Sequence, residues 1–97
     1  MDVFDNVNGF EWDKHNALKI FEKHNVTIRE AEDIFADKKA LISEARHSGT
    51  EIRFAIMGKS SKKNLIAVFT IRNNKIRIIS ARPQSKQERK LYDEKTK

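Results

Sequence analysis

Three segments in the second half of the chain follow one another with short connections, and this feature limits the fold most. The segments are EIRFAIMG (51–58), NLIAVFTI (64–71) and KIRIISAR (75–82), and all are rich in β-branched and aromatic residues. Asn73 and Asn74 form a two-residue connection, and asparagine tolerates the positive φ that such a hairpin turn needs. Strands joined this closely lie side by side and antiparallel. The segments therefore predict a β-meander.

A further extended segment, ALISEAR (40–46), precedes the meander across the turn HSGT (47–50), in which Gly49 is the expected turn residue. It brings the predicted antiparallel sheet to four strands. After the last strand, Pro83 ends the pairing, and residues 84–94 have the pattern of a C-terminal helix.

The residues before the sheet repeat with a helical period. After a short strand at 10–12, Asp13 is a suitable N-cap, and Asn25 suits the left-handed position that closes a helix. Between them, four residues share one face: Ala17, Ile20, Phe21 and His24. Thr27 and Glu30 form the capping box of a second helix, whose apolar stripe is Ile28, Ala31, Ile34 and Phe35. We therefore predict an α+β fold in one domain, residues 1–97, with two N-terminal helices, a twisted four-stranded antiparallel sheet and a C-terminal helix.

The positive charge of the chain is concentrated near its C-terminus. The formal net charge is +6, and residues 72–97 hold nine basic and three acidic residues, which accounts for the whole excess. A local field of this kind attracts phosphate groups, as in nucleic acids. The alternative is a solvated tail that only keeps the protein soluble.

Several classes of protein are excluded by what the sequence lacks. There are no cysteines, which excludes a disulfide framework, a thiolate nucleophile and cysteine-bound zinc. The histidines at 15, 24 and 47 are not spaced as zinc ligands, so we expect neither a metal site nor a cofactor. The longest apolar runs are only a few residues and the N-terminal segment is acidic, which favours a cytoplasmic protein over a secreted or membrane-spanning one.

Two arginines are candidates for the open face of the sheet, because the helices are expected to cover the more apolar face. Strict alternation places Arg53 on the side of Met57, and Arg77 on the side of Ile79 and Ala81. Whether Arg53 and Arg77 converge depends on strand register, which the sequence does not specify.

Several blocks of the sequence occur together, in this order, in a known family. FEWD (10–13), KHNV (23–26), AEDIFAD (31–37), EIRFAIMG (51–58), RIISAR (77–82) and ERKLYDE (88–94) resemble the BrnT family of toxins from bacterial type II toxin–antitoxin systems. The resemblance covers roughly residues 10–94. One departure is Asn25, where the family pattern usually has glycine, but asparagine can adopt the same backbone conformation.

The resemblance implies a RelE-like fold and a ribonuclease that stops translation by cutting RNA, free or on the ribosome. It also implies a BrnA-like antitoxin of ribbon-helix-helix type, which covers the toxin and supplies the contact with DNA. Two alternatives remain: a module that binds nucleic acid or a partner without chemistry, and a toxin that acts on DNA gyrase, as ParE-type relatives do.

RNA cleavage without a metal ion needs cations that stabilise the charge of the transition state, and the planar fork of arginine binds two phosphate oxygens at once. By the resemblance, Arg77 and Arg82 match the RIISAR block, and Arg53 matches the arginine of an E-x-R strand. We expect Arg77 and Arg82 to clamp the scissile phosphate. The alternative is that the arginines form structural salt bridges with Asp13, Glu51 or a helix-end carboxylate.

His24 is the candidate for proton transfer near neutral pH. It follows Lys23 at a predicted helix end, where the helix dipole favours an imidazolium that would serve as a general acid or a phosphate ligand. Alternatively, His24 packs in the interior and bonds a backbone carbonyl. Lys23 is a candidate RNA contact beside it.

The C-terminal helix carries the remaining candidates. Lys86, Arg89 and Lys90 are expected to guide the flanking RNA backbone. Tyr92 would stack on a base or take part in proton transfer, or else pack against the sheet beside Leu91. A lone tryptophan beside a helix cap is more often a core residue, so Trp12 is not assigned to the site.

Overall fold

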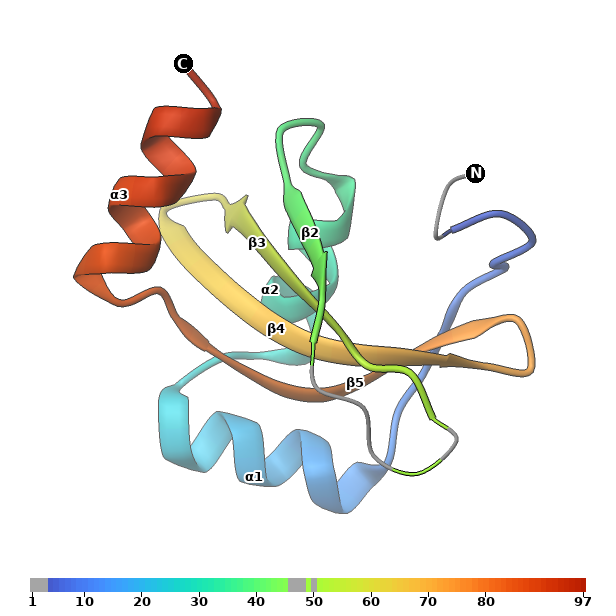
Figure 1. Ribbon diagram of the computed structural model, residues 1–97. Helices are drawn as coiled ribbons and strands as arrows, with labels where there is room; N and C mark the ends of the chain where they lie inside the picture. Colours follow the sequence, from blue (N-terminus) through green and yellow to red (C-terminus); the bar gives the residue numbers. More distant parts are fainter. Residues whose placement is uncertain (1–3, 46–48, 50) are drawn as a thin grey trace.

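The computed structural model describes residues 4–45, 49 and 51–97. Their elements, in chain order, are β1 (Phe10–Glu11), α1 (Lys14–His24), α2 (Ile28–Asp33), the 3₁₀ helix η1 (Ile34–Ala36), β2 (Leu41–Glu44), β3 (Phe54–Ser60), β4 (Lys63–Arg72), β5 (Lys75–Pro83) and α3 (Lys86–Lys95). Figure 1 shows α1 running along β5, α2 behind β3 and β4, and α3 beside the end of the sheet.

The helix ends follow from local capping, as predicted. The Asp13 side chain accepts a hydrogen bond from the His15 N–H, and Asn25 closes α1 with φ 55°. Thr27 and Glu30 form the predicted capping box of α2. The predicted stripe of the second helix is nevertheless divided, because α2 ends at Asp33 and the chain tightens into η1 before turning toward β2.

The prediction of a four-stranded antiparallel sheet was incomplete. Among the described residues, the sheet has five strands in the order β1-β5-β4-β3-β2, and β1 lies parallel to β5. Phe10 is opposite Ile76 and Glu11 is opposite Arg77. A strand of two residues has no alternation from which its partner can be read; its place is set where the chain enters α1, which packs along β5.

Two further strand boundaries differ from the prediction. β3 begins at Phe54, so Arg53 lies just before the strand, and its carbonyl accepts a hydrogen bond from the Ala45 N–H at 2.7 Å. β2 is limited to Leu41–Glu44. The predicted HSGT turn (47–50) and His47 lie largely outside the described residues, which include only Gly49 of that segment. The Asn73–Asn74 turn is confirmed, with φ of 54° and 62°.

A β-bulge at Ile79 changes which residues of β5 share a face. Phe69 pairs with Ile78 and Val68 pairs with Ser80, so Ile79 is skipped. The predicted grouping of Arg77 with Ile79 and Ala81 is therefore wrong. Ala81 is fully buried on the same side as Ile76 and Ile78. The opposite side carries three residues: Arg77, Ser80 and Arg82.

Helix α1 covers the edge of β5 beyond its short pairing with β1. The Asn16 side-chain amide donates hydrogen bonds to the carbonyls of Ile78 and Ile79, at 2.9 and 3.1 Å. These carbonyls lie at the bulge, beyond the pairing of β5 with β1, which ends at Arg77. Asn16 therefore satisfies the backbone where the bulge leaves it exposed.

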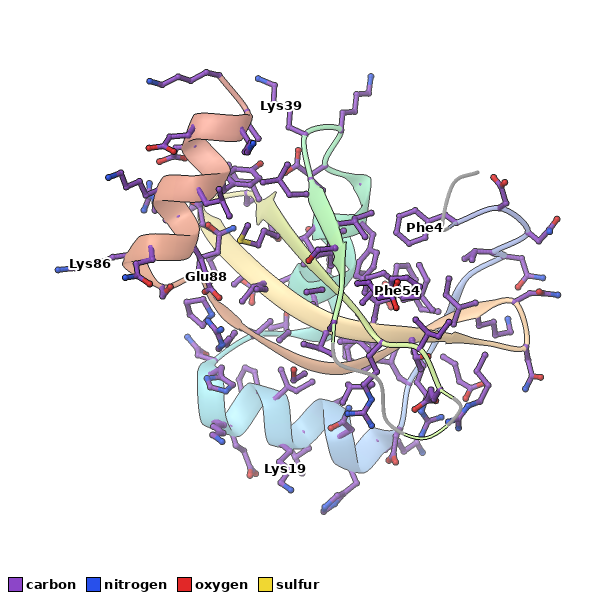
Figure 2. All side chains as sticks on the ribbon, viewed as in Figure 1. Phe4, Lys19, Lys39, Phe54, Lys86 and Glu88 are labelled. Carbon is purple, nitrogen blue, oxygen red and sulfur yellow. The ribbon has the colours of Figure 1, made fainter. Side chains whose placement is uncertain are left out.

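The covered face of the sheet holds the core. Fully buried side chains from η1, β3, β4 and β5 meet there, including Ile34, Ile56, Leu65, Phe69 and Ile78. At one side, five aromatic rings pack with centroid distances of 5.0–5.9 Å: Phe4, Phe10, Phe35, Phe54 and Phe69. Figure 2 labels Phe4 and Phe54 of this cluster. Trp12 packs against the core, as expected, and its indole N–H donates to Glu32 at 2.7 Å.

Candidate functional site

A row of three side chains follows β5 on the face that α1 and α2 do not cover. Arg77, Ser80 and Arg82 are opposite Thr70, Val68 and Ile66, which are alternate residues of β4. The two arginines are thus four positions apart along β4, or about 13 Å at the usual rise of a strand. We call this row the β5 strip. A phosphate that both arginines contact would therefore have to lie between their two side chains.

One end of the β5 strip is rich in ion pairs. Arg77 contacts Glu11 at 2.7 Å and Asp13 at 3.9 Å. Glu51 contacts Arg72 at 2.6 Å and Arg53 at 3.8 Å. These charges lie at the same end because Thr70 is opposite Arg77 and its hydroxyl donates to the Ile52 carbonyl, next to Arg53. Arg53 and Arg77 therefore lie at the same end of the sheet. Their contacts with Glu51 and Asp13 are those that the salt-bridge alternative predicted.

The other end of the β5 strip carries Arg82. Its guanidinium makes two hydrogen bonds to the carboxylate of Glu88, at 2.7 and 2.9 Å. These bonds lower the pKa of Glu88 to about 2 and raise the pKa of Arg82 above its ordinary value. The Arg82 side chain stays 44% exposed, so this pair lies at the surface and remains accessible to a phosphate.

His24 lies at the Arg82 end of the molecule. It is the last residue of α1, and the next carbonyl, that of Asn25, accepts a hydrogen bond from Lys63 at the start of β4. The neighbouring Asn64 carbonyl accepts from the Gln84 N–H, between β5 and α3. His24 is half-buried and Lys23 is exposed. Because α1 has eleven residues and spans about 16 Å, His24 is remote from Arg77 at the opposite end.

The three basic candidates on α3 are all exposed, as a surface for RNA requires. They are Lys86, Arg89 and Lys90. Figure 2 shows Lys86 pointing into solvent, while Glu88 lies toward the sheet. Arg89 contacts Asp93 at 3.9 Å along the helix. The basic side of α3 is therefore separate from the side that meets Arg82.

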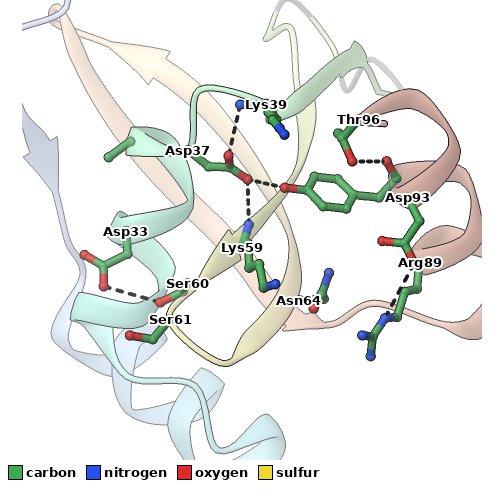
Figure 3. Close-up of a pocket in the computed structure, with 12 residues that line it drawn as sticks. Asp33, Asp37, Lys39, Lys59, Ser60, Ser61, Asn64, Arg89, Asp93 and Thr96 are labelled. Atoms are coloured by element: carbon green, nitrogen blue, oxygen red, sulfur yellow. Dashed lines mark hydrogen bonds and ion pairs between the residues drawn. The ribbon is translucent and has the colours of Figure 1, made fainter.

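Tyr92 is only 6% exposed, which confirms the packed alternative for its ring. Its hydroxyl donates a short hydrogen bond to Asp37, and burial together with this bond raises the pKa of Tyr92 to about 12. The hydroxyl borders a polar cleft of about 560 Å³ between α3, the end of η1 and the β3–β4 hairpin (Figure 3). The ring has little surface left for stacking on a base.

A second, apolar groove lies next to Arg82. It measures about 410 Å³ and is lined mainly by side chains of β2, β3, β4 and α3, among them Leu41, Met57, Ile66 and Leu91. Glu88 and Lys95 complete its lining. Ile66 is opposite Arg82 in the sheet, so the groove and the Arg82 end of the β5 strip are continuous.

Three residues in or beside the β5 strip were not predicted from the sequence. Ser80 joins the β5 strip only through the bulge, Glu88 is placed by the docking of α3, and Glu11 meets Arg77 through the parallel pairing of β1. A local signal existed for Glu88 alone, since Ser85 and Glu88 have the spacing of a capping box. The candidate residues therefore lie toward two ends of the sheet, with Arg53 and Arg77 at one end and Arg82 and His24 at the other, rather than in one cluster.

Two general features of the described residues complete the picture. None of the described helices is long and apolar enough to cross a membrane. Within residues 4–45, 49 and 51–97, no group of three His, Asp or Glu side chains is placed to hold a metal ion.

Comparison with known proteins identifies the family of the chain. No curated protein matches the chain. Residues 12–88 match the family described as "Ribonuclease toxin, BrnT, of type II toxin-antitoxin system", and this range holds α1, the sheet from β2 to β5 and the start of α3. The range also contains both ends of the β5 strip, His24 and Glu88. The chain therefore belongs to the BrnT family of type II toxin–antitoxin ribonuclease toxins.

Proposed function

We propose that this BrnT toxin is an endoribonuclease that cleaves RNA without a metal ion and thereby inhibits translation in the cytoplasm. The observation that carries the proposal is the bulge at Ile79, which places Arg77 and Arg82 on one face of β5 although five positions separate them. A row of arginines on rigid strand backbone suits an extended RNA strand, because each guanidinium can hold a phosphate at a defined distance from the next.

The Arg82 end is where we place the chemistry. Cleavage begins when a ribose 2′-hydroxyl loses its proton to water and its oxygen attacks the adjacent phosphorus. It ends when the bond to the 5′-oxygen breaks, which leaves a 2′,3′-cyclic phosphate, and the 5′-oxygen takes up a proton. Arg82 stabilises the charge that builds on the phosphate oxygens, and His24, at the same end, donates the proton to the 5′-oxygen. Arg77 holds another phosphate farther along the RNA strand, about 13 Å away along the strip.

The remaining candidates act on the flanking backbone. Lys23 extends the basic surface beside His24, and Lys86, Arg89 and Lys90 extend it along the exposed side of α3. Arg53 adds positive charge at the Arg77 end of the β5 strip, since Thr70 is opposite Arg77 and bonds the Ile52 carbonyl next to Arg53. Tyr92 contributes by docking α3 through Asp37, and only a rearrangement would release its ring for RNA.

We propose further that a BrnA-like antitoxin of ribbon-helix-helix type neutralises the toxin and provides its contact with DNA. The family belongs to type II toxin–antitoxin systems, in which the antitoxin is a protein. An amphipathic antitoxin segment with acidic residues suits the apolar groove that ends at Arg82, because it would bury Leu91 and neutralise Arg82 together. RNA would then be excluded by direct competition.

Induction of the toxin alone in a bacterium tests the proposed activity. Incorporation of labelled methionine should fall before that of thymidine, and primer extension should show new internal ends in transcripts. Collapse of thymidine incorporation while methionine incorporation continues would indicate a gyrase-directed toxin. Retention of RNA by the purified protein without any cleavage would indicate a binding module.

Purification of the tagged toxin from its native host tests the partner. A small companion protein should co-purify, and its removal should restore cleavage. Isolation of the active toxin alone, with no companion at any salt concentration, would contradict the antitoxin proposal.

A further inference from the structure

Glu88 has two structural roles at once. Its carboxylate accepts the Ser85 N–H at 2.8 Å, which completes the capping box that begins α3, and it accepts both terminal nitrogens of Arg82 at 2.7 and 2.9 Å. A bidentate pair of this kind fixes the plane of the guanidinium as well as its position. The first turn of α3 therefore determines where the Arg82 charge lies.

The hydrogen bonds of Arg82 leave one edge of its guanidinium open. Nη1 donates to Glu88 and to the Pro83 carbonyl, at 2.7 and 3.1 Å, and Nη2 donates once, to Glu88. Of the five N–H groups, the Nε–H and the second Nη2–H have no partner among the described residues. These two N–H groups point from the same side edge and match the spacing of two phosphate oxygens.

From this geometry we propose that Glu88 is a positioning residue that presents the Nε–Nη2 edge of Arg82 to the scissile phosphate. The inference rests on the proposed function, in which Arg82 stabilises the transition state. Glu88 does not touch the RNA; it acts by holding Arg82, which would otherwise sample many rotamers on an exposed strand end.

The negative charge of Glu88 has a second, opposite effect on the substrate. It partly cancels the field of Arg82 and so weakens the attraction of the whole RNA strand. Removal of this charge should therefore tighten RNA binding and slow turnover at the same time. A residue that only stabilised the fold would not separate the two quantities in this way.

The Glu88→Gln variant tests the proposal. Glutamine keeps the capping box but removes the charge that holds Arg82. We expect kcat to fall about ten-fold because the guanidinium is no longer held in place, and KM for a single-stranded RNA to fall about two-fold or more at low salt. Circular dichroism and Tm should show a folded protein with α3 retained.

A matched control exists at the other capping box. Glu30 accepts the Thr27 N–H at 2.9 Å and pairs with Lys63 at 2.9 Å, so Glu30→Gln makes the same chemical change at an equivalent place in α2. Its kcat should stay within about two-fold of the parent, since no proposed phosphate ligand is held by Glu30. Glu88→Asp, which keeps the charge but shortens the side chain, should lower kcat without tightening binding.

Three results would overturn the proposal. A higher kcat in Glu88→Gln would mean that Glu88 masks Arg82 instead of presenting it. An unchanged kcat would mean that the position of Arg82 is irrelevant to turnover. An equal loss in Glu30→Gln and Glu88→Gln, with equal loss of Tm, would mean that only the capping box counts.

A second measurement separates this inference from the proposed function. In ¹⁵N NMR of the toxin, inorganic phosphate should shift the Arg82 Nε–H signal, and Glu88→Gln should broaden it and reduce that shift. If the toxin cleaves no RNA but these changes occur, the proposed function fails and the positioning role stands. The opposite case is a toxin that cleaves RNA and is impaired by Arg82→Ala. If the Arg82 Nε–H signal is then the same in the toxin and in Glu88→Gln, the positioning role alone fails.

Discussion

The hydroxyl of Tyr92 donates a hydrogen bond to the carboxylate of Asp37, fifty-five residues away in the sequence. The same carboxylate accepts the backbone N–H groups of Lys39 and Lys59, both at 2.9 Å. Asp37 thereby joins α3 to the turn before β2 and to the end of β3, as Figure 3 shows. Although burial opposes it, these bonds lower the pKa of Asp37. The bond therefore helps to hold α3, the helix that carries Glu88, against the rest of the protein.

Tyr92→Phe should lower the free energy of unfolding by about 1–2 kcal/mol, because Asp37 loses a partner while the ring stays packed. Chemical denaturation measures the loss, with Lys90→Ala on the exposed side of α3 as the control. The Tyr92 pKa is raised from 10.0 to about 12. Its stabilisation is therefore present below pH 10 and is lost as the pH rises through 12, so the difference between the two proteins should shrink over that window. A constant difference across it would contradict the role of the hydroxyl.

Arg82→Ala should abolish toxicity while the protein stays folded and still binds its antitoxin. We expect cleavage to slow about ten- to thousand-fold, the usual loss for one transition-state donor. Arg77→Ala should also lose toxicity, through weaker positioning of the RNA strand. Cleavage rates measured against salt concentration, with circular dichroism to confirm folding, decide the matter.

Lys86→Ala and Lys90→Ala should weaken cleavage only modestly, in a salt-dependent way, with about one unit of salt slope for each lost phosphate contact. They serve as controls for the arginine variants. Equal and small effects at all four positions would mean that the β5 strip and α3 only attract RNA, and the active site would then lie elsewhere.

Gly58→Ala should destabilise the fold by about 1–3 kcal/mol, the usual cost of overpacking. A Cβ at Gly58 would lie 2.9 Å from both the Cβ and the carbonyl oxygen of Ile34, so η1 would have to move away from β3. Lys59→Ala, at the exposed neighbouring position, is the control. Equal Tm values for the two variants would contradict the close approach of η1.

Asn16→Ala should destabilise the protein by about 1–3 kcal/mol, because it leaves the carbonyls of Ile78 and Ile79 without their donor. Because these carbonyls flank the bulge, RNA cleavage should also fall at temperatures where the variant is folded. His15→Ala, at the exposed neighbouring position, should change neither quantity. Normal cleavage by a destabilised Asn16→Ala would show that the bulge holds Arg82 without help from α1.

The sequence by itself determined the elements whose causes lie within a few residues. The caps of α1 and α2, the Asn73–Asn74 turn and the three long strands were all predicted, because capping bonds, positive φ and alternation are local properties. The family could also be inferred from short blocks. The candidate arginines could be named from the sequence, but their arrangement on the sheet could not.

Only the tertiary structure decided how those residues meet. The parallel pairing of β1, the bulge at Ile79 and the bond between Tyr92 and Asp37 each join segments far apart in the sequence. A one-residue shift in register exchanges the faces of a strand, so Arg82 would face the core if β5 alternated strictly from Arg77. The energy that selects the register comes from the packing of Ile78 and Ala81 and from the hydrogen bonds of Asn16, which exist only once α1 and the sheet are assembled.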